Sequence, residues 1–204
     1  EAKIPEDLDA VDAALVEKAF KAGTLTIEGR DIANAVIPGT TITFPVFMQR
    51  ENLLELSDAD AEINNKAKEN LDNGDDVENL KPGDSIEIAI EVTSNYDNDD
   101  DVDIDSVDAN LDCQDDSQID IDDDSLDVGD LSPDDKQTDS FNINVEEDAK
   151  DGSFNCELQT LGTDKNGARM GEKISFDMDV ERESHDIQLR LPALPPAITC
   201  DDTS

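Results

Sequence analysis

Negative charge limits what this chain can fold into more than any other feature of its sequence. Aspartate and glutamate number 54 against 15 lysines and arginines, a formal net charge of −39 over 204 residues. A compact state with so much charge of one sign repels itself, and dilute salt screens that repulsion only over about 8–10 Å. The chain therefore either stays disordered or folds where concentrated salt or a bound divalent cation shortens the screening length.

Hydrophobic content favours the folded alternative. Low hydrophobicity with high net charge is the signature of disorder, but 36% of this chain is hydrophobic and those residues recur with a period of two. Aspartate suits neither helices nor strands, so its abundance indicates a surface that must stay hydrated in molar salt. We expect a halophilic protein whose stability rises with salt. Nucleic acid is excluded as a partner because phosphate binding needs a basic patch.

Alternation of polar and apolar residues predicts the fold class. It runs through residues 24–28 and 40–47, where Pro45 indicates an edge strand or a bulge because proline cannot donate to a ladder. It is more regular from 86–92 to 174–180, with turn signals between the strands. This pattern predicts an all-β protein, an antiparallel immunoglobulin-like sandwich.

Two segments depart from the strand pattern. Residues 57–62 open like a capped helix with acid in its first turn, and Ile63, Ala67 and Leu71 follow at helical spacing. We therefore expect a short helical insertion near 58–72. The first 22 residues fit either a short helix or an opening strand or extended arm, and the β-rich remainder favours the latter.

Length leaves the number of sandwiches open. One sandwich takes about 100 residues, so the chain holds one elaborated sandwich or two unequal ones. We expect an N-terminal β segment or small sandwich over 1–80, carrying the helical insertion, and an immunoglobulin-like sandwich over 81–183. Residues 184–204 are then a C-terminal extended strand or linker.

Turn and strand motifs in the second half carry a family resemblance. They are the turn at 80–84 with the strand that ends at Ser94-Asn95, the turn at 129–134 with the strand 139–145, and the corner at 148–154. In these motifs the chain resembles the extracellular immunoglobulin-like domains of archaeal cell-surface proteins, of the S-layer, pilus and adhesin type. The resemblance covers about half of the chain and implies scaffold or adhesion work without assigning a binding site.

Cysteine use indicates an oxidising compartment. Cys113 and Cys156 lie in predicted strands 43 positions apart, and a sandwich can place them on facing or neighbouring strands as a disulfide. Cys200 is left to pair with another chain, to pair with sequence beyond Ser204, or to stay free. None of the three has zinc-site spacing.

The ends and hydropathy of the chain point to the cell exterior. It begins at Glu1 and not at Met, which suits removal of a signal peptide or a fragment boundary. No apolar run approaches the roughly 20 residues that span a bilayer. We expect an extracellular or cell-surface protein with no direct membrane span in these residues.

Two acidic runs suggest a calcium site. Alternating carboxylates supply the oxygen ligands that Ca²⁺ prefers. The candidate ligands are Asp97, Asp99, Asp101, Asp120, Asp122 and Asp124. An EF-hand is excluded, since Val102 and Asp108 stand where that loop needs Gly and Glu. The competing interpretation, a solvated strand face, is favoured unless both runs meet at one pole of the sandwich.

Catalysis is not expected. The one histidine, His185, stands beside Ser184 and Asp186, and residues adjacent in sequence do not form a catalytic triad. We interpret His185 as a surface residue. Aromatic residues make up 3% of the chain and tryptophan is absent, which argues against a stacking platform for carbohydrate.

The C-terminal stretch 189–200 is apolar and proline-rich. It is interpreted as a linker or self-packed segment, or as a strand that completes a neighbouring subunit by β-augmentation. The candidate intersubunit residues are Leu189, Leu191, Leu194, Ile198 and Cys200.

Together these features predict a structural subunit or module of an archaeal cell-surface assembly, a filament or S-layer adapted to high salt. Its expected partners are copies of itself in a homopolymer or other cell-surface proteins. The alternative is a calcium-dependent adhesin or ligand-binding surface domain. No cofactor other than Ca²⁺ is expected.

Overall fold

Strands make up the regular structure of the chain. A computed structural model describes residues 4–64, 66–115 and 117–182, and within these residues no helix forms. The strands are β1 (Ala19–Ile27), β2 (Ile42–Gln49), β3 (Leu54–Ile63), β4 (Lys66–Asn70), β5 (Asp76–Leu80), β6 (Ser85–Ser94), β7 (Ile104–Cys113), β8 (Ile119–Ile121), β9 (Ser125–Leu131), β10 (Lys136–Val145), β11 (Gly152–Asp164) and β12 (Arg169–Val180).

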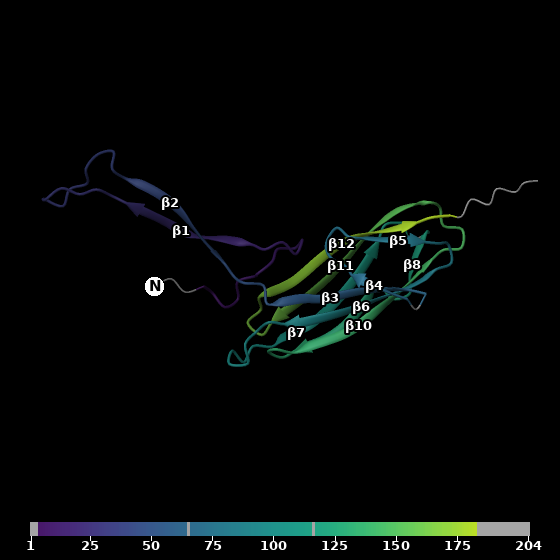
Figure 1. Cartoon of the computed structure of the whole chain (residues 1–204). Helices are drawn as coiled ribbons and strands as arrows, with labels where there is room; N and C mark the ends of the chain where they lie inside the picture. The colour runs from purple at the N-terminus through teal and green to yellow at the C-terminus, as the bar shows by residue number, and fades with distance from the viewer. Residues whose placement is uncertain (1–3, 65, 116, 183–204) are drawn as a thin grey trace, which may run out of the picture.

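Ten of these strands form two five-stranded sheets that pack face to face (Figure 1). One sheet has the order β4-β3-β6-β10-β8 and the other the order β5-β12-β11-β7-β9. All neighbours are antiparallel except β5 and β12, which run parallel. Strands β3, β6 and β10 take the places of A, B and E in an immunoglobulin sandwich, and β7, β11 and β12 those of C, F and G. The predicted fold class is confirmed.

Alternating side chains build the core between the sheets. In β6 the residues Ile86, Ile88, Ile90 and Val92 are buried, while the intervening residues face outward. The facing sheet contributes buried residues of the same kind from β7, β11 and β12. The strands of the sandwich therefore present an apolar row to the core and a polar row to solvent, and in β3, β6 and β7 that outward row carries carboxylates.

The turn at 81–84 shows how local sequence sets these strands. Gly83 has a φ of +86°, which favours glycine because other side chains rarely adopt that conformation. The backbone N–H of Lys81 donates to the Asp84 carboxylate at 2.8 Å, which closes the turn ahead of β6.

The helical insertion expected near 58–72 is wrong. These residues form the hairpin of β3 and β4 at the edge of the first sheet. The pairing of β3 with β6 shifts between Leu56 and Asp58, so Ser57 is an extra residue in the strand. A bulge of this kind breaks the period of two, and the broken period resembled a helix start.

The sandwich takes in residues from both sides of the boundary expected at 80. Strand β3 pairs with β6 and β5 pairs with β12, so residues 54–80 belong to the same two sheets as the remainder. The C-terminal segment predicted at 184–204 lies outside the described residues.

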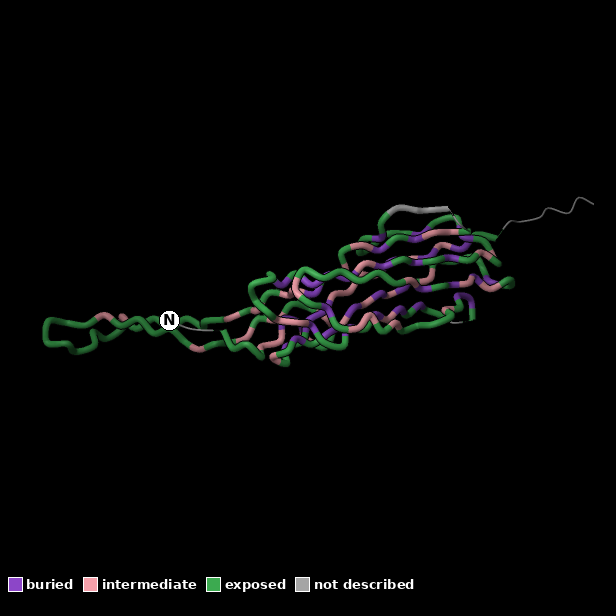
Figure 2. Tube along the Cα trace, turned by 90° about the horizontal axis from the view of Figure 1, so that it is seen from below, coloured by how far each residue is buried: buried purple, intermediate pink, exposed green. Residues whose placement is uncertain are grey.

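Strands β1 and β2 form a separate two-stranded hairpin, which we call the arm (residues 19–49). The arm projects from one end of the sandwich (Figure 1), and its tube is exposed along most of its length, whereas buried residues gather in the sandwich (Figure 2). Pro45 lies in β2, whose one partner strand is β1, as the sequence predicted for an edge strand.

A disulfide joins Cys113 of β7 to Cys156 of β11. The two residues lie directly opposite each other in an antiparallel pair, with Cα atoms 4.0 Å apart. The bond therefore links neighbouring strands of one sheet, at the end of the sandwich away from the arm.

Candidate functional site

The arm has two chemically different faces. Residues directly opposite in an antiparallel pair share a face, and Ala22 forms a bulge where the register shifts. The apolar face consists of Phe20, Gly23, Leu25, Ile27, Ile42, Phe44, Val46 and Met48. The threonine face consists of Ala19, Lys21, Thr24, Thr26, Thr43, Pro45, Phe47 and Gln49. Phe47 is the one large apolar side chain on the threonine face.

Most of the apolar face is uncovered in the described chain, although the Lys18 ammonium lies 4.5 Å from the centroid of the Phe20 ring at its root. The face members Leu25, Ile27, Ile42, Phe44 and Val46 each expose between 42% and 54% of their surface. Large exposed hydrophobic residues of the described chain all lie between positions 4 and 47, and nine of those eleven belong to the arm. Contiguous exposed apolar surface marks an interaction site.

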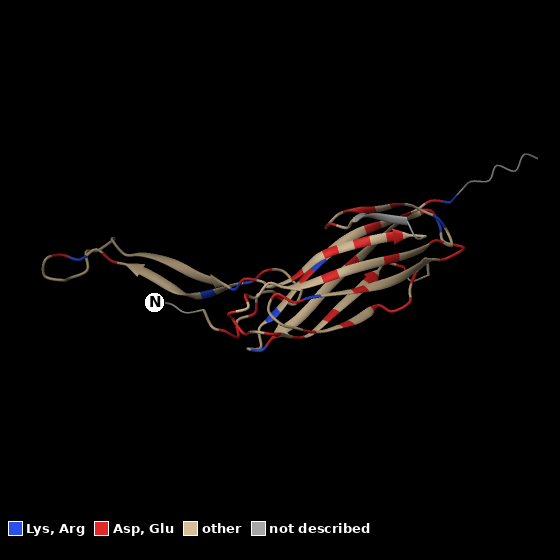
Figure 3. Cartoon of the chain, turned by 60° about the horizontal axis from the view of Figure 1, so that its bottom comes forward, with Lys and Arg blue, Asp and Glu red and all other residues tan. Residues whose placement is uncertain are grey.

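Charge separates the arm from the sandwich. Lys21 and Arg30 balance Glu28 and Asp31, so residues 19–49 carry no net charge and the whole excess of −39 lies elsewhere. Figure 3 shows the contrast, with acidic residues spread over the sandwich and few along the arm. Three of the six phenylalanines of the chain also lie in the arm. A neutral apolar arm can approach a surface that the acidic sandwich would repel.

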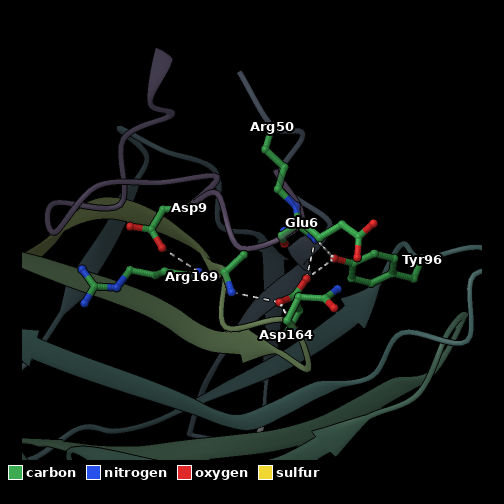
Figure 4. A network of polar contacts seen from close by, with 8 residues as sticks. Glu6, Asp9, Arg50, Tyr96, Asp164 and Arg169 are labelled. Carbon is green, nitrogen blue, oxygen red and sulfur yellow. Dashed lines mark hydrogen bonds and ion pairs between the residues drawn. The ribbon is translucent and has the colours of Figure 1, made fainter. Parts of the chain in front are cut away.

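A buried polar network anchors the arm to the sandwich (Figure 4). Arg50 follows β2 directly, and its guanidinium donates to the Asp164 carboxylate, to the Tyr96 hydroxyl at 2.6 Å and to the backbone carbonyl of Glu6. The Tyr96 hydroxyl donates to Asp164 at 2.8 Å. Asp164 also accepts the backbone N–H groups of Asn166 and Ala168, each at 2.9 Å. The network joins the arm, the β6–β7 loop and the β11–β12 turn.

Protonation states in the network follow from these contacts. Burial raises the pKa of the Asp164 carboxyl, but the Ala168 N–H, the Tyr96 hydroxyl and the Arg50 guanidinium outweigh it and hold this pKa below its ordinary value. Burial and the hydrogen bond to Asp164 raise the pKa of Tyr96 well above its ordinary value. At neutral pH the network therefore holds one carboxylate, one guanidinium and one neutral phenol.

A second set of contacts fixes the arm from its other side. The Asn52 amide donates to the Gly171 carbonyl at 3.0 Å and accepts the Gly171 N–H at 3.1 Å. Ahead of β1, buried Ala10 donates its N–H to the Arg169 carbonyl, and Asp9 accepts the Arg169 N–H. Both ends of the hairpin are thus tied to β12, so the arm leaves the sandwich in a defined direction.

The two acidic runs do not meet. Residues Asp97, Asp99 and Asp101 lie in the β6–β7 loop at the arm end of the sandwich. Asp120 lies in β8, which pairs with the opposite end of β10, and Asp122 and Asp124 follow in the β8–β9 loop. Since β6 and β10 have ten residues each, a strand length of about 30 Å separates the runs. The two runs therefore lie too far apart to share one cation, and calcium binding by either run alone stays a prediction.

Metal and membrane features are absent from the residues that the structure describes. No group of three or more His, Cys, Asp or Glu side chains is placed to hold a metal ion there. No helix in that part of the chain is long and apolar enough to cross a membrane. His185 and the intersubunit candidates Leu189, Leu191, Leu194, Ile198 and Cys200 lie outside the described residues.

Sequence reasoning missed the arm and its anchor as functional features. Alternation predicted the strands at 24–28 and 40–47, but it did not show that their apolar face is uncovered. The signal that distinguishes them is the neutral charge of residues 19–49 within so acidic a chain. No local signal identifies Arg50, Tyr96 and Asp164, because the fold alone brings them together.

Comparison with known proteins yields distant structural similarity. No protein-family model matches the chain, and no curated protein matches its sequence. The C-terminal domain of Wzt is 12% identical, with 64% of this chain and 75% of that chain covered and a TM-score of 0.40.

Two further solved structures are similar at the same level. A PapD-like domain of human CEP192 is 11% identical over 60% of this chain and 85% of its own, with a TM-score of 0.36. The sporulation control protein Spo0M of Bacillus subtilis is 13% identical over 62% of this chain and 51% of its own, with a TM-score of 0.32. At these scores the similarities say nothing about function.

Proposed function

We propose that this protein is a structural subunit of a cell-surface assembly adapted to high salt, such as an archaeal filament or surface layer, and that it associates with copies of itself through the arm. It acts by binding and not by catalysis. The observation that carries the proposal is the uncovered apolar face of the arm, held out from the sandwich by the anchor network.

The energetics of the arm support a binding role. An isolated two-stranded hairpin is marginally stable in water at best, because neither of its faces is covered. This arm keeps a row of isoleucine, leucine, valine and phenylalanine side chains on one face. Burial of those side chains against a partner stabilises the hairpin and the complex together.

Two further features support an extracellular setting. Disulfides persist in oxidising compartments, and Cys113 and Cys156 are joined. The acidic outer surface of the sandwich favours solubility in concentrated salt, where the Debye length falls to about 3 Å at 1 M and repulsion between subunits is screened. Molar salt also strengthens contacts between apolar surfaces when its ions are excluded from the protein surface.

The test compares two neighbouring substitutions on β2. Phe44→Asp places a carboxylate on the apolar face, and Thr43→Asp places the same carboxylate on the exposed threonine face. We expect the wild type and Thr43→Asp to form oligomers in molar NaCl, and Phe44→Asp to lose the oligomers that the arm holds together. Sedimentation velocity and electron microscopy of the same samples measure the outcome.

Circular dichroism controls for folding, since Phe44 makes no part of the sandwich core. A wild-type protein that stays monomeric at every concentration in molar NaCl would rule out the proposal. If Phe44→Asp and the wild type formed oligomers equally, self-association would not run through the apolar face of the arm. The calcium-dependent adhesin is not proposed further, since no contact among the described residues favours it.

A further inference from the structure

We infer that the apolar face of one arm packs against the apolar face of the arm of a second copy, with the two arms antiparallel. This inference rests on the proposed function and specifies the surface that receives the arm. Two arms related by a two-fold axis bury the same residues on both copies. The joint is then an isologous arm-to-arm dimer.

Apolar complementarity identifies the arm as the receiving surface. An apolar face gains free energy when it leaves water against another apolar surface. On the described part of the sandwich, from residue 54 to residue 182, no large hydrophobic side chain is exposed. The outward rows of β3, β6 and β7 carry carboxylates instead, and acidic residues are spread over the sandwich (Figure 3). Among the described surfaces of a second copy, the arm itself is therefore the one that matches.

Electrostatics fixes the relative direction of the two arms. The arm has no net charge, so two arms meet without repulsion, whereas two sandwiches repel each other. Antiparallel packing places the root of each arm beside the tip of the other. A nine-residue strand spans about 30 Å, so the sandwiches are separated by roughly ten Debye lengths of about 3 Å in molar salt. Parallel packing would bring the two acidic sandwiches together.

The relief of the apolar face suits interdigitation. Gly23 lies opposite Val46 in the middle of the face, and a Cβ built on Gly23 meets no atom within 4 Å. The face is therefore lower at Gly23 than at Leu25 and Phe44, which leaves room for a side chain from the second arm. Facing sheets pack about 10 Å apart with interlocking side chains, and a two-fold axis between the Gly23–Val46 and Leu25–Phe44 pairs places the Phe44 ring of one arm over Gly23 of the other.

Size predicts the strength of the joint. The apolar face is about 30 Å long and about 10 Å wide, so two arms together cover roughly 600 Å², less than the roughly 1,000 Å² that a stable interface clears. We expect a reversible dimer whose population rises with protein concentration and with salt. Because an isologous joint closes on itself, growth into a longer filament needs a second contact elsewhere on the chain.

A lipid surface fits the arm less well than a second arm does. The tip of the arm is mixed, since the charged residues Glu28, Arg30 and Asp31 stand there beside the exposed Ile32, Val36 and Ile37. The apolar residues of the two strands run along one face from root to tip, and the other face carries threonines and Lys21. This distribution matches a flat protein surface laid along the arm.

A mixing experiment with full-length chains tests the inference. Affinity-tagged wild type is mixed in molar NaCl with an untagged chain, captured, and the untagged chain is quantified. The untagged chains are the wild type, Leu25→Asp/Phe44→Asp on the apolar face, and Thr26→Asp/Thr43→Asp on the threonine face. Both double variants place two carboxylates in directly opposite positions of adjacent pairs, so they differ only in the face that carries the charge.

We expect capture of wild type and of Thr26→Asp/Thr43→Asp, with at least tenfold less of Leu25→Asp/Phe44→Asp. A neutral pair, Leu25→Thr/Phe44→Thr, keeps strand propensity and should lose capture as well. Full capture of the apolar-face variants would overturn the inference while leaving self-association intact, because their sandwiches would still receive a wild-type arm. Failure of the wild type to capture itself would overturn the proposed function too. Binding of the wild type to phosphatidylcholine vesicles, without binding to itself, would likewise overturn both the inference and the proposed function.

Discussion

Replacement of Asp164 by asparagine removes the one negative charge of the anchor network while keeping its shape. The remaining side-chain oxygen can still accept the N–H groups of Asn166 and Ala168. The new amide NH₂, however, faces two donors, the Arg50 guanidinium and the Tyr96 hydroxyl. The tyrosine hydroxyl can turn to accept a hydrogen bond, but the guanidinium cannot, and its side chain is only 14% exposed.

The magnitude follows from what is lost. A hydrogen bond to a charged group contributes about 1.5–3 kcal/mol, and a buried charge that loses its partner costs about 3–5 kcal/mol when fully buried. Arg50 keeps some contact with water, so we expect Asp164→Asn to lower the free energy of unfolding by about 2–4 kcal/mol. At about 2–4 °C per kcal/mol for a chain of this size, the melting temperature should fall by roughly 10 °C.

Thermal unfolding in molar NaCl, followed by circular dichroism, measures this difference. Asp108→Asn is the matched control, because Asp108 is exposed on β7 and the substitution removes the same charge. Surface substitutions of that kind change stability by about 0.5 kcal/mol or less. If the two variants melt within about 1 °C of each other, the anchor does not stabilise the protein as argued.

The same pair of proteins gives a pH dependence with a defined sign. The pKa of Asp164 lies below its ordinary value in the folded state, so its stabilisation is present above the unfolded pKa of about 3.9 and is lost as pH falls through the folded-state pKa. Protonation of the many repelling carboxylates acts in the opposite direction. The stability difference between wild type and Asp164→Asn isolates Asp164, and it should shrink in acid. A difference that grows as the pH falls would contradict the assignment.

Two further predictions concern the sandwich itself. Reduction of the Cys113–Cys156 bond, or Cys113→Ser/Cys156→Ser, opens a loop with a sequence separation of 43. Chain entropy predicts that the free energy of unfolding falls by about 4 kcal/mol. Denaturant unfolding with and without reductant measures this loss, and unchanged midpoints would refute it. In Gly171→Ala the new Cβ would lie 2.3 Å from the Thr160 carbonyl oxygen. We therefore expect the free energy of unfolding, measured by thermal unfolding, to fall by at least about 1–3 kcal/mol. In Gly23→Ala the new Cβ meets no neighbour, so this variant serves as the control.

Strands that alternate without interruption were predictable from sequence. Residues 86–92 show the rule, since each isoleucine predicted to face inward is buried in β6. The error over 57–72 has a physical cause in the bulge at Ser57. Leu54 and Leu56 lie on even positions, but Ala59, Ala61 and Ile63 lie on odd ones, so no single period of two spans β3. Pairing with β6 determines the bulge, and the sequence of β3 alone does not show how β3 pairs.

The arm and the anchor mark the limits of sequence reasoning differently. Alternation at 24–28 and 40–47 shows that one face is apolar, but it does not show what covers that face. The anchor joins Arg50, Tyr96 and Asp164 across sequence separations of 46, 68 and 114 residues. Such distant pairs are set by the topology of the sheets, and no local spacing foretells them.

Tyr96 also makes the root of the arm optically visible. The chain contains one tyrosine and no tryptophan, so near-ultraviolet emission beyond the phenylalanine range comes from a single ring. That ring is buried, and its hydroxyl touches both a carboxylate and a guanidinium. A change in the contacts between the arm and the sandwich therefore alters the tyrosine spectrum directly, with no attached dye. Changes at the far end of the sandwich leave the spectrum unchanged.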